Sequence, residues 1–215
     1  MPSTIHYVSV FNKGDTLIPQ SDLIDLEYAQ TKCPVHNHKQ SRTFVATSPI
    51  NFSLSIDRSN NKISCSRPEL LEYDDEHINS PKPVMQLMFP KFLFYTEEDN
   101  IWFEFNDHPM TALKNNFIAI SGWFNLSNWS RASSTAITLV DEKRCVIIEK
   151  GDPLFRVSFY PPNLDDSIVL KKETNTEVVN QWVEAHSKIT EQDWRPRLFS
   201  KTKTESKCPF SFLFK

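Results

Sequence analysis

The chain has 215 residues and a formal net charge of −3, so it lacks the broad basic surface that nucleic-acid binding requires. A chain of this length can bury a full core without disulfides or metal ions. Its three glycines, Gly14, Gly122 and Gly151, are far apart, whereas phosphate-binding loops need clustered glycines, which argues against Rossmann and P-loop folds.

Fourteen prolines and sixteen phenylalanines favour strands and turns over helices. The first residues carry neither the basic nor the apolar region of a signal peptide, and no apolar run is long enough to cross a bilayer. Four widely spaced cysteines are then expected as reduced thiols. These features predict a cytoplasmic protein that is neither secreted nor embedded in a membrane.

A period of two in the apolar residues predicts about a dozen short strands. The clearest is 50–57, where Ile50, Phe52, Leu54 and Ile56 alternate with polar residues. This pattern predicts one buried face and one face exposed to solvent. In chain order the expected strands are 5–11, 42–47, 50–57, 62–65, 84–89, 91–96, 100–105, 117–124, 136–140, 144–149, 154–159 and 167–171.

Two helices interrupt this series. One is expected at 21–30, begun by Ser21, and the other at 174–189, where Thr174 and Glu177 have the spacing of a capping box. A long surface loop is expected at 66–83. The chain ends in an apolar segment, 208–215, which an isolated protein would not leave exposed.

Consecutive strands joined by short turns predict an antiparallel fold, because parallel pairs need long crossovers. The expected fold is therefore all-β, an antiparallel β-sandwich or jelly roll with one C-terminal helix and an apolar tail. The expected organisation is a sandwich domain over 1–172, with a helix and tail over 173–215 packed on it.

A polar corner at 125–131 is the place where we expect ligand contact. Trp129 offers a stacking face, and Arg131 offers five donors for a carboxylate or phosphate. A corner held by the indole and by arginine bonds to backbone carbonyls is the structural alternative. The full set of predicted ligand-binding residues is Trp129, Arg131, Asn125, Asp152 and Cys33.

No metal or other cofactor is expected, although one alternative is open. Cys33, His36 and His38 carry donors that suit zinc, and Cys65 would complete a tetrahedral set. The weakness is that only one ligand cluster is compact. An iron site is a further alternative at His108, but the His-x-Asp or His-x-Glu pair of an iron facial triad is missing, so His108 is expected as a solvated turn residue.

The hairpin turn at Gly151 and Asp152 has a mechanical explanation. Glycine permits a positive φ, and aspartate can close an Asx-type turn. Asp152 would be a catalytic acid only in an apolar setting that raised its pKa. The chain contains no Gly-x-Ser-x-Gly elbow and no compact Cys/His pair, so nothing supports nucleophilic catalysis, and whether the protein is an enzyme stays undecided.

Five short motifs lie between residues 33 and 160. They are Cys33-Pro34, Ser48-Pro49, Phe92 to Phe94, a Gly-x-Phe-Asn-x-x-x-Trp-x-Arg block (Gly122, Phe124, Asn125, Trp129, Arg131) and Lys150 to Pro153. In these motifs the chain resembles a family of uncharacterised proteins from bacteria and marine tailed phages. The resemblance implies a phage or phage-like origin, hence the host cytoplasm, and it brings no known activity.

A Gly-Trp corner, an Asn-bearing strand and a hairpin ending in Lys-Gly-Asp-Pro are also similar to the last strands of dUTPase and dCTP-deaminase jelly rolls. The nucleotide-binding serine motifs of those enzymes are not recognisable in this sequence. The likeness therefore implies a related β fold at most. The predicted function is therefore a phage-type binding or assembly protein. Its expected partner is another protein or a second copy, through the tail residues Phe210, Phe212, Leu213 and Phe214, and neither membrane nor nucleic acid. The alternative is a jelly-roll enzyme or small-ligand binder for an anionic metabolite or nucleotide.

Overall fold

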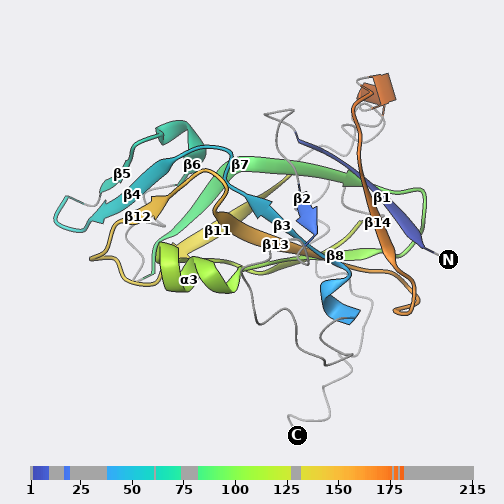
Figure 1. Ribbon diagram of the computed structural model, residues 1–215. Helices are drawn as coiled ribbons and strands as arrows, with labels where there is room; N and C mark the ends of the chain where they lie inside the picture. The colour runs from blue at the N-terminus through green and yellow to red at the C-terminus, as the bar shows by residue number, and fades with distance from the viewer. Residues whose placement is uncertain are drawn as a thin grey trace, which may run out of the picture.

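A computed structural model of the chain describes residues 2–9, 17–19, 38–60, 62–73, 82–126, 132–175, 177–178 and 180–181. These residues form three β-sheets and few helical segments, so the predicted all-β class is confirmed (Figure 1). No helix in this part of the chain has the length and apolar character that crossing a membrane demands.

The first sheet has six strands in the order β14-β1-β7-β11-β9, with β6 paired to β7 beside this path. Its strands show the alternation predicted from the sequence; in β1 and β11 every second residue is buried. The strands are β1 (Ser3–Ser9), β6 (Leu71–Glu72), β7 (Val84–Tyr95), β9 (Phe117–Ala119), β11 (Ser133–Leu139) and β14 (Ile168–Lys172).

The second sheet has five strands in the order β10-β8-β13-β3-β2, all antiparallel. They are β2 (Leu17–Pro19), β3 (Thr43–Thr47), β8 (Trp102–Asn106), β10 (Gly122–Asn125) and β13 (Pro153–Tyr160). A third sheet has the order β12-β4-β5. It consists of β4 (Phe52–Asp57), β5 (Lys62–Cys65) and β12 (Val146–Ile148).

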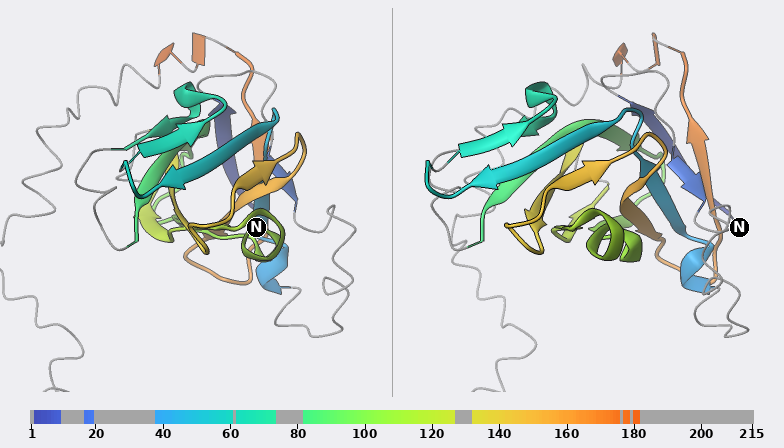
Figure 2. Two further views of the ribbon diagram at one scale, coloured as in Figure 1. Left: turned by 90° about the vertical axis from the view of Figure 1, so that its left-hand side faces the viewer. Right: turned by 60° about the vertical axis from the view of Figure 1, so that its left-hand side comes forward.

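The first and second sheets pack face to face as a sandwich, and one core cluster joins them to the third sheet, which contributes Phe52, Leu54, Ile63, Val146 and Ile148 (Figure 2). The ring of Phe94 on β7 lies 5.4 Å from that of Phe103 on β8 and 5.3 Å from that of Phe159 on β13. Further along, Phe92 meets Phe155 at 6.4 Å. Burial of each such ring contributes about 1.5–3 kcal/mol of stability, so the high phenylalanine content of the sequence is used mainly here.

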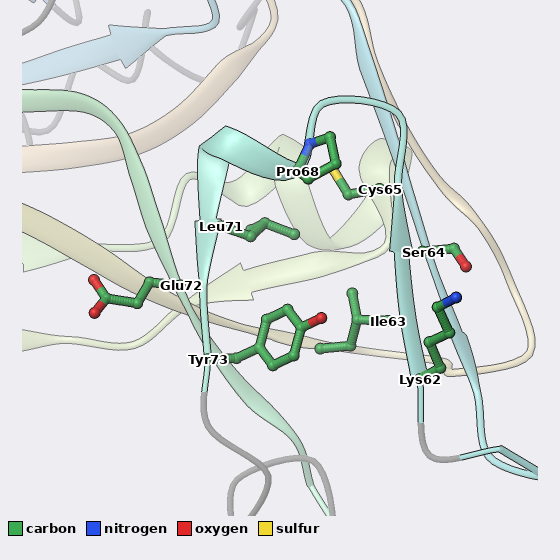
Figure 3. A pocket seen from close by; sticks show the side chains of 8 residues that line it. All are labelled: Lys62, Ile63, Ser64, Cys65, Pro68, Leu71, Glu72 and Tyr73. Carbon is green, nitrogen blue, oxygen red and sulfur yellow. The ribbon is translucent and has the colours of Figure 1, made fainter.

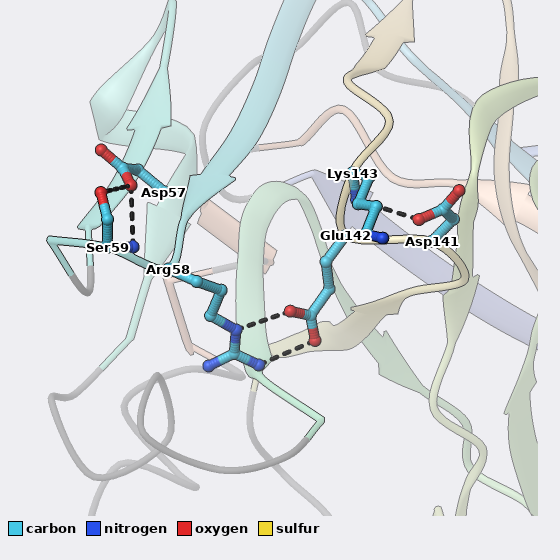
Figure 4. Close-up of polar contacts among 6 residues, drawn as sticks. All are labelled: Asp57, Arg58, Ser59, Asp141, Glu142 and Lys143. Carbon is cyan, nitrogen blue, oxygen red and sulfur yellow. Dashed lines mark hydrogen bonds and ion pairs between the residues drawn. The ribbon is translucent and has the colours of Figure 1, made fainter.

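A bidentate ion pair ties the third sheet to the rest of the fold (Figure 4). Asp57 and Asp141 each close a turn by accepting a backbone N–H, from Ser59 and Lys143 respectively. Between these turns the Arg58 guanidinium donates to both carboxylate oxygens of Glu142, at 2.6 and 2.7 Å. This pairing lowers the pKa of Glu142.

We expect Arg58→Met and Glu142→Gln each to lower stability slightly, because the pair is only half-buried and solvent weakens it. Either change alone removes the contact. The double variant should therefore be no less stable than the less stable of the two single variants. Urea unfolding of all four proteins at low and high salt measures this coupling. A coupling that is zero at low salt would show that the pair contributes nothing.

The predicted strands needed several corrections. Strand β2 (Leu17–Pro19) was not predicted. The expected strands 84–89 and 91–96 are one strand, β7, and a register shift opposite Ser133 and Thr135 accommodates Pro90. The expected strand 117–124 is two strands in different sheets, β9 and β10. One strand pair, β1 with β14, is parallel; these strands are far apart in the sequence, so the intervening chain supplies the long connection that a parallel pair needs.

A helix was missed and another was only partly tested. Helix α3 (Pro109–Asn115) follows the predicted turn at His108, in a stretch to which no element was assigned. The 3₁₀ helix η3 (Pro68–Leu70) and β6 interrupt the expected loop at 66–83. Residues 177–178 and 180–181 are helical, and Asn175 rather than Thr174 accepts the N–H of Glu177. The rest of that helix, the expected helix at 21–30 and the tail at 208–215 lie outside the described residues.

Candidate functional site

The predicted binding residues are only partly within the described part of the chain. Trp129, Arg131 and Cys33 lie outside it. Asn125 ends β10 and pairs with Trp102, which in turn pairs with Tyr160 at the end of β13. Asp152 precedes the other end of β13, about 25 Å away for an extended strand of this length. Asn125 and Asp152 therefore do not belong to one site.

Asp152 serves the hairpin turn. Gly151 has a φ of +94°, as the turn was expected to require. The Asp152 carboxylate accepts the backbone N–H of Glu149 at 3.0 Å and the Lys114 ammonium at 2.8 Å. Burial alone would raise the pKa of Asp152, but the hydrogen bond from Lys114 and that from Glu149 outweigh it, so the pKa is lowered. A carboxyl held ionised in this way is not suited to act as a general acid.

The metal alternative is tested only in part. His36 and Cys33 lie outside the described residues, while His38 lies within them. The His38 ring Nδ1 is 3.3 Å from Nη2 of Arg42. The backbone carbonyl of His38 accepts a hydrogen bond from Nε of Arg42 at 3.4 Å. No group of three or more His, Cys, Asp or Glu side chains within the described residues could hold a metal ion. The expectation of no cofactor, with zinc or iron as the alternative, stays a prediction.

His108 is not a solvated turn residue as expected. It is 1% exposed and is the N-cap of α3, where its Nδ1 accepts the N–H of Met110 at 3.3 Å. Burial, with a smaller contribution from the nearby Arg156 guanidinium, lowers the pKa of His108 to about 4. The ring is therefore neutral at neutral pH and has a structural role at the start of the helix.

Three aromatic rings share the outer face of the second sheet, opposite the core. Trp123 is 53% exposed and stacks on Tyr160, with ring centroids 4.7 Å apart and planes inclined by 30°. Trp102 lies beside Trp123 at 6.1 Å. Because the three residues come from β10, β8 and β13, the rings form one surface across neighbouring strands. We call this surface, formed by Trp102, Trp123 and Tyr160, the aromatic face.

Polar contacts hold the aromatic face in place. The Tyr160 hydroxyl donates to Glu104 at 2.7 Å, and Glu104 pairs across the strands with Trp123. Burial, together with this carboxylate, raises the pKa of Tyr160 to about 12, so the hydroxyl stays protonated and keeps donating. The Trp102 indole donates to the Asn100 side chain at 3.2 Å. The rings are thus fixed before any ligand arrives, which lowers the entropic cost of binding.

Gly122 and Phe124, two residues of the Gly-x-Phe-Asn segment, support this face from below. The Phe124 ring stacks on Phe103 of the core at 5.0 Å. It also lies over Gly122, where a Cβ atom would come within 2.7 Å of the ring. Gly122 and Phe124 therefore fix the path of β10, and with it the position of Trp123.

A groove of about 630 Å³ lies between β5 and the segment formed by η3 and β6 (Figure 3). Leu71 and Tyr73 project from one wall toward Ile63 on the other. Cys65 is the one thiol in its lining, and burial raises the pKa of that thiol. Its sulfur also accepts the N–H of Arg67 at 3.4 Å. The groove has apolar walls but no activated nucleophile with a neighbouring base.

The aromatic face was not recognised in the sequence, although a signal for it exists. In the segment from Trp102 to Asn106, Trp102 and Glu104 alternate with the two buried phenylalanines, Phe103 and Phe105. The period of two therefore places a tryptophan and a carboxylate together on the outer face. Contact with Trp123 and Tyr160 depends on strand order, which this local pattern does not contain.

No family model and no curated protein matches the sequence. Several solved structures are similar to the chain, among them three dUTPases. That of EIAV has a TM-score of 0.39 and 7% identity, over 74% of this chain and 91% of that chain. That of Streptococcus mutans has a TM-score of 0.37 and 9% identity, over 56% of this chain and 77% of that one.

The dUTPase of phage phi11 of S. aureus has a TM-score of 0.35 and 11% identity, over 58% of this chain and 80% of that one. TM-scores this low do not establish a shared topology, and fold similarity alone does not carry function. The aromatic face is therefore the feature of the chain itself on which a functional argument can rest.

Proposed function

We propose that the chain is a non-catalytic, phage-type binding or assembly protein that contacts a protein partner through the aromatic face. The observation that carries this is Trp123, a tryptophan more than half exposed yet fixed by stacking on Tyr160. Tryptophan and tyrosine are enriched among the few interface residues that supply most of the binding energy. A contiguous exposed apolar patch, unlike a single exposed apolar residue, is a feature of protein–protein interaction sites.

The chemistry of the described residues supports this proposal over an enzyme. Asp152, which accepts a hydrogen bond from Lys114 of α3, is kept ionised. The one buried histidine among these residues, His108, caps a helix, and Cys65 is bonded to backbone. None of these groups stands next to another in the arrangement that general acid–base or nucleophilic catalysis uses. The tail residues Phe210 to Phe214 would add a second contact, as the sequence predicts.

The alternative, an enzyme or binder for an anionic metabolite or nucleotide, receives less support. The carboxylate of Glu104 is the charged group bonded directly to a ring of the aromatic face. It would repel a phosphate or carboxylate placed on Trp123. An anionic ligand would need a different surface.

Selection from a random peptide library against the immobilised full chain tests the proposal. Peptides that bind the parent protein should bind Trp123→Ala more weakly by roughly ten-fold or more, since truncating a hot-spot tryptophan costs about 2 kcal/mol or more. Tyr73→Ala is the matched control, because Tyr73 is a 40% exposed aromatic residue at the groove.

Loss of binding with Tyr73→Ala instead would move the site to the groove. A selection that enriches nothing, or that enriches peptides indifferent to Trp123→Ala, would refute the aromatic face as a protein-binding surface. Circular dichroism of each variant separates loss of binding from loss of fold.

A further inference from the structure

The end of the sandwich that carries the aromatic face also gathers acidic residues. Trp102 is the first residue of β8, directly after the turn at 96–101, and this turn contains Glu97, Glu98 and Asp99, all exposed. Tyr160 is the last residue of β13, directly before the loop at 161–167, which contains Asp165 and Asp166. Both acidic segments thus adjoin strands of the aromatic face.

Hydrogen bonds show that these two segments meet at the start of β1. The Thr4 N–H donates to Glu98 Oε1 at 2.8 Å, and the Thr96 hydroxyl donates to the Thr4 carbonyl at 2.8 Å. The Ser3 N–H donates to the Ser167 carbonyl at 2.8 Å. The acidic turn and the acidic loop therefore lie on either side of the first residues of β1, near the N label in Figure 1.

Among the described residues, no basic group forms an ion pair with the carboxylates of the 97–99 turn. Arg42 is only 6% exposed, and its Nε donates to the His38 carbonyl. Arg156 is half-buried; its Nε donates to the Asp107 carbonyl at 2.8 Å, and its charge also interacts with Glu104 and Tyr160. Lys39 is exposed, but it is a single charge. In the described part of the chain, the exposed charge beside the aromatic face is therefore mainly that of the acidic 97–99 turn.

We infer that the partner presents an arginine-rich segment, whose guanidinium groups stack on Trp123 and face the carboxylates of Glu104 and of the 97–99 turn. This inference rests on the proposed function and names the chemistry of the partner. A planar guanidinium suits a flat indole better than an ammonium does, and it can pair with a carboxylate at the same time. Neighbouring carboxylates would add attraction that salt weakens.

The probe is a synthetic Arg-Gly repeat peptide, and the matched control replaces every arginine by citrulline, which has nearly the same shape but no charge. Binding to the full chain is followed by tryptophan fluorescence and by calorimetry. We expect the arginine peptide to bind at least ten-fold more tightly than the citrulline peptide at low salt, and the difference to shrink as salt is added.

Two further comparisons locate the site. Trp123→Ala and the double variant Glu97→Gln/Asp99→Asn should each weaken the arginine peptide by roughly five-fold or more. Glu98 is left unchanged because it accepts a bond from β1. The control Glu69→Gln/Glu72→Gln removes the same charge at β6 and η3, at the other end of the molecule in Figure 1, and should leave binding nearly unchanged.

Equal binding of the citrulline peptide, or an equal loss with the control pair, would overturn the inference. In that case neutral peptides selected in the library experiment, still lost with Trp123→Ala, would keep the proposed function while rejecting the basic partner. If no peptide of any charge depends on Trp123, both the proposed function and the inference fail.

Discussion

Replacing Phe103 by alanine should cost about 4 kcal/mol of unfolding free energy, in the range found when a buried phenylalanine is truncated in a close-packed core. Phe103 is fully buried. Its ring lies 5.0 to 6.2 Å from four other phenylalanine rings, those of Phe94, Phe105, Phe124 and Phe159. No single neighbour can move into the space left behind without giving up its own contacts.

The size of this loss is large against the whole stability of a domain, about 5–15 kcal/mol. If Phe103→Ala does not fold, Phe103→Leu keeps most of the volume and should cost about 1–2 kcal/mol. Urea unfolding measures both variants. Leu113→Ala on α3 is the control, because Leu113 is 75% exposed and its loss should change stability by less than about 0.5 kcal/mol.

A loss below about 2 kcal/mol for Phe103→Ala would mean that the two sheets do not pack through this ring. The same variant bears on the aromatic face, because Phe103 supports Phe124, and Phe124 fixes the path of β10 beneath Trp123. We therefore expect peptide binding to weaken in Phe103→Leu even where the protein stays folded.

Local pattern was sufficient to predict most strands. β4 and β5 follow directly from the alternation of Phe52, Leu54 and Ile56 and from the turn that separates them from Ile63. The turn at Gly151 could also be predicted, since a positive φ favours glycine whatever lies around it. These features depend on neighbours in sequence, which is why a single sequence contains them.

Features that depend on distant partners could not be read in the same way. Nothing in the local sequence separates β9 from β10, because the residues around Ser121 and Gly122 look like one continuous strand. The two halves differ only in their partners: β9 pairs with β11 in the first sheet, and β10 pairs with β8 in the second. The stacking of Trp123 on Tyr160 has the same origin, since it needs β8 between β10 and β13. The candidate site was therefore placed at the corner after Asn125 rather than on the sheet.

Helix α3 was missed for a different reason. Its seven residues are too few to show a helical period, and Leu113, the apolar residue that would suggest one, points to solvent. The sequence did contain one sign of a helix. Pro109 stands at the first helical position, directly after His108, whose side chain can cap the helix. His108 is an uncommon cap, so the segment read as a polar turn.

His108 should make the protein markedly less stable in acid. Its Nδ1 accepts the N–H of Met110, and its Nε2 is buried with no hydrogen-bond partner among the described residues. A second proton would have to displace the Met110 bond and would place a charge near the Arg156 guanidinium; Asp107 offsets only part of this cost. The folded state therefore resists protonation until the pH approaches about 4.

The sign of the effect follows from which state binds the proton. Above about pH 6.5 the ring is neutral in both states and contributes no pH dependence. As the pH falls from there toward 4, the unfolded chain takes up the proton and the folded chain does not, so stability falls. A shift from 6.5 to about 4 corresponds to a loss of about 3 kcal/mol once the pH is below both values.

His108→Asn isolates this contribution. Asparagine is a strong N-cap whose oxygen can accept the Met110 N–H, and it does not titrate in this range. The variant should be somewhat less stable than the parent near neutral pH, because the smaller side chain leaves a cavity. Its stability should fall less steeply on acidification, so that the two urea-unfolding curves converge or cross.

Protonation of carboxylates with lowered pKa values, such as Asp152, also destabilises the protein in acid. These carboxylates are present in both proteins, so their contributions cancel in the difference between the two unfolding free energies. The measured quantity is therefore the gap in unfolding free energy between parent and His108→Asn from neutral pH to about pH 4. Parallel curves would mean that His108 titrates alike in the folded and unfolded chains, which is incompatible with a neutral, buried cap at the start of α3.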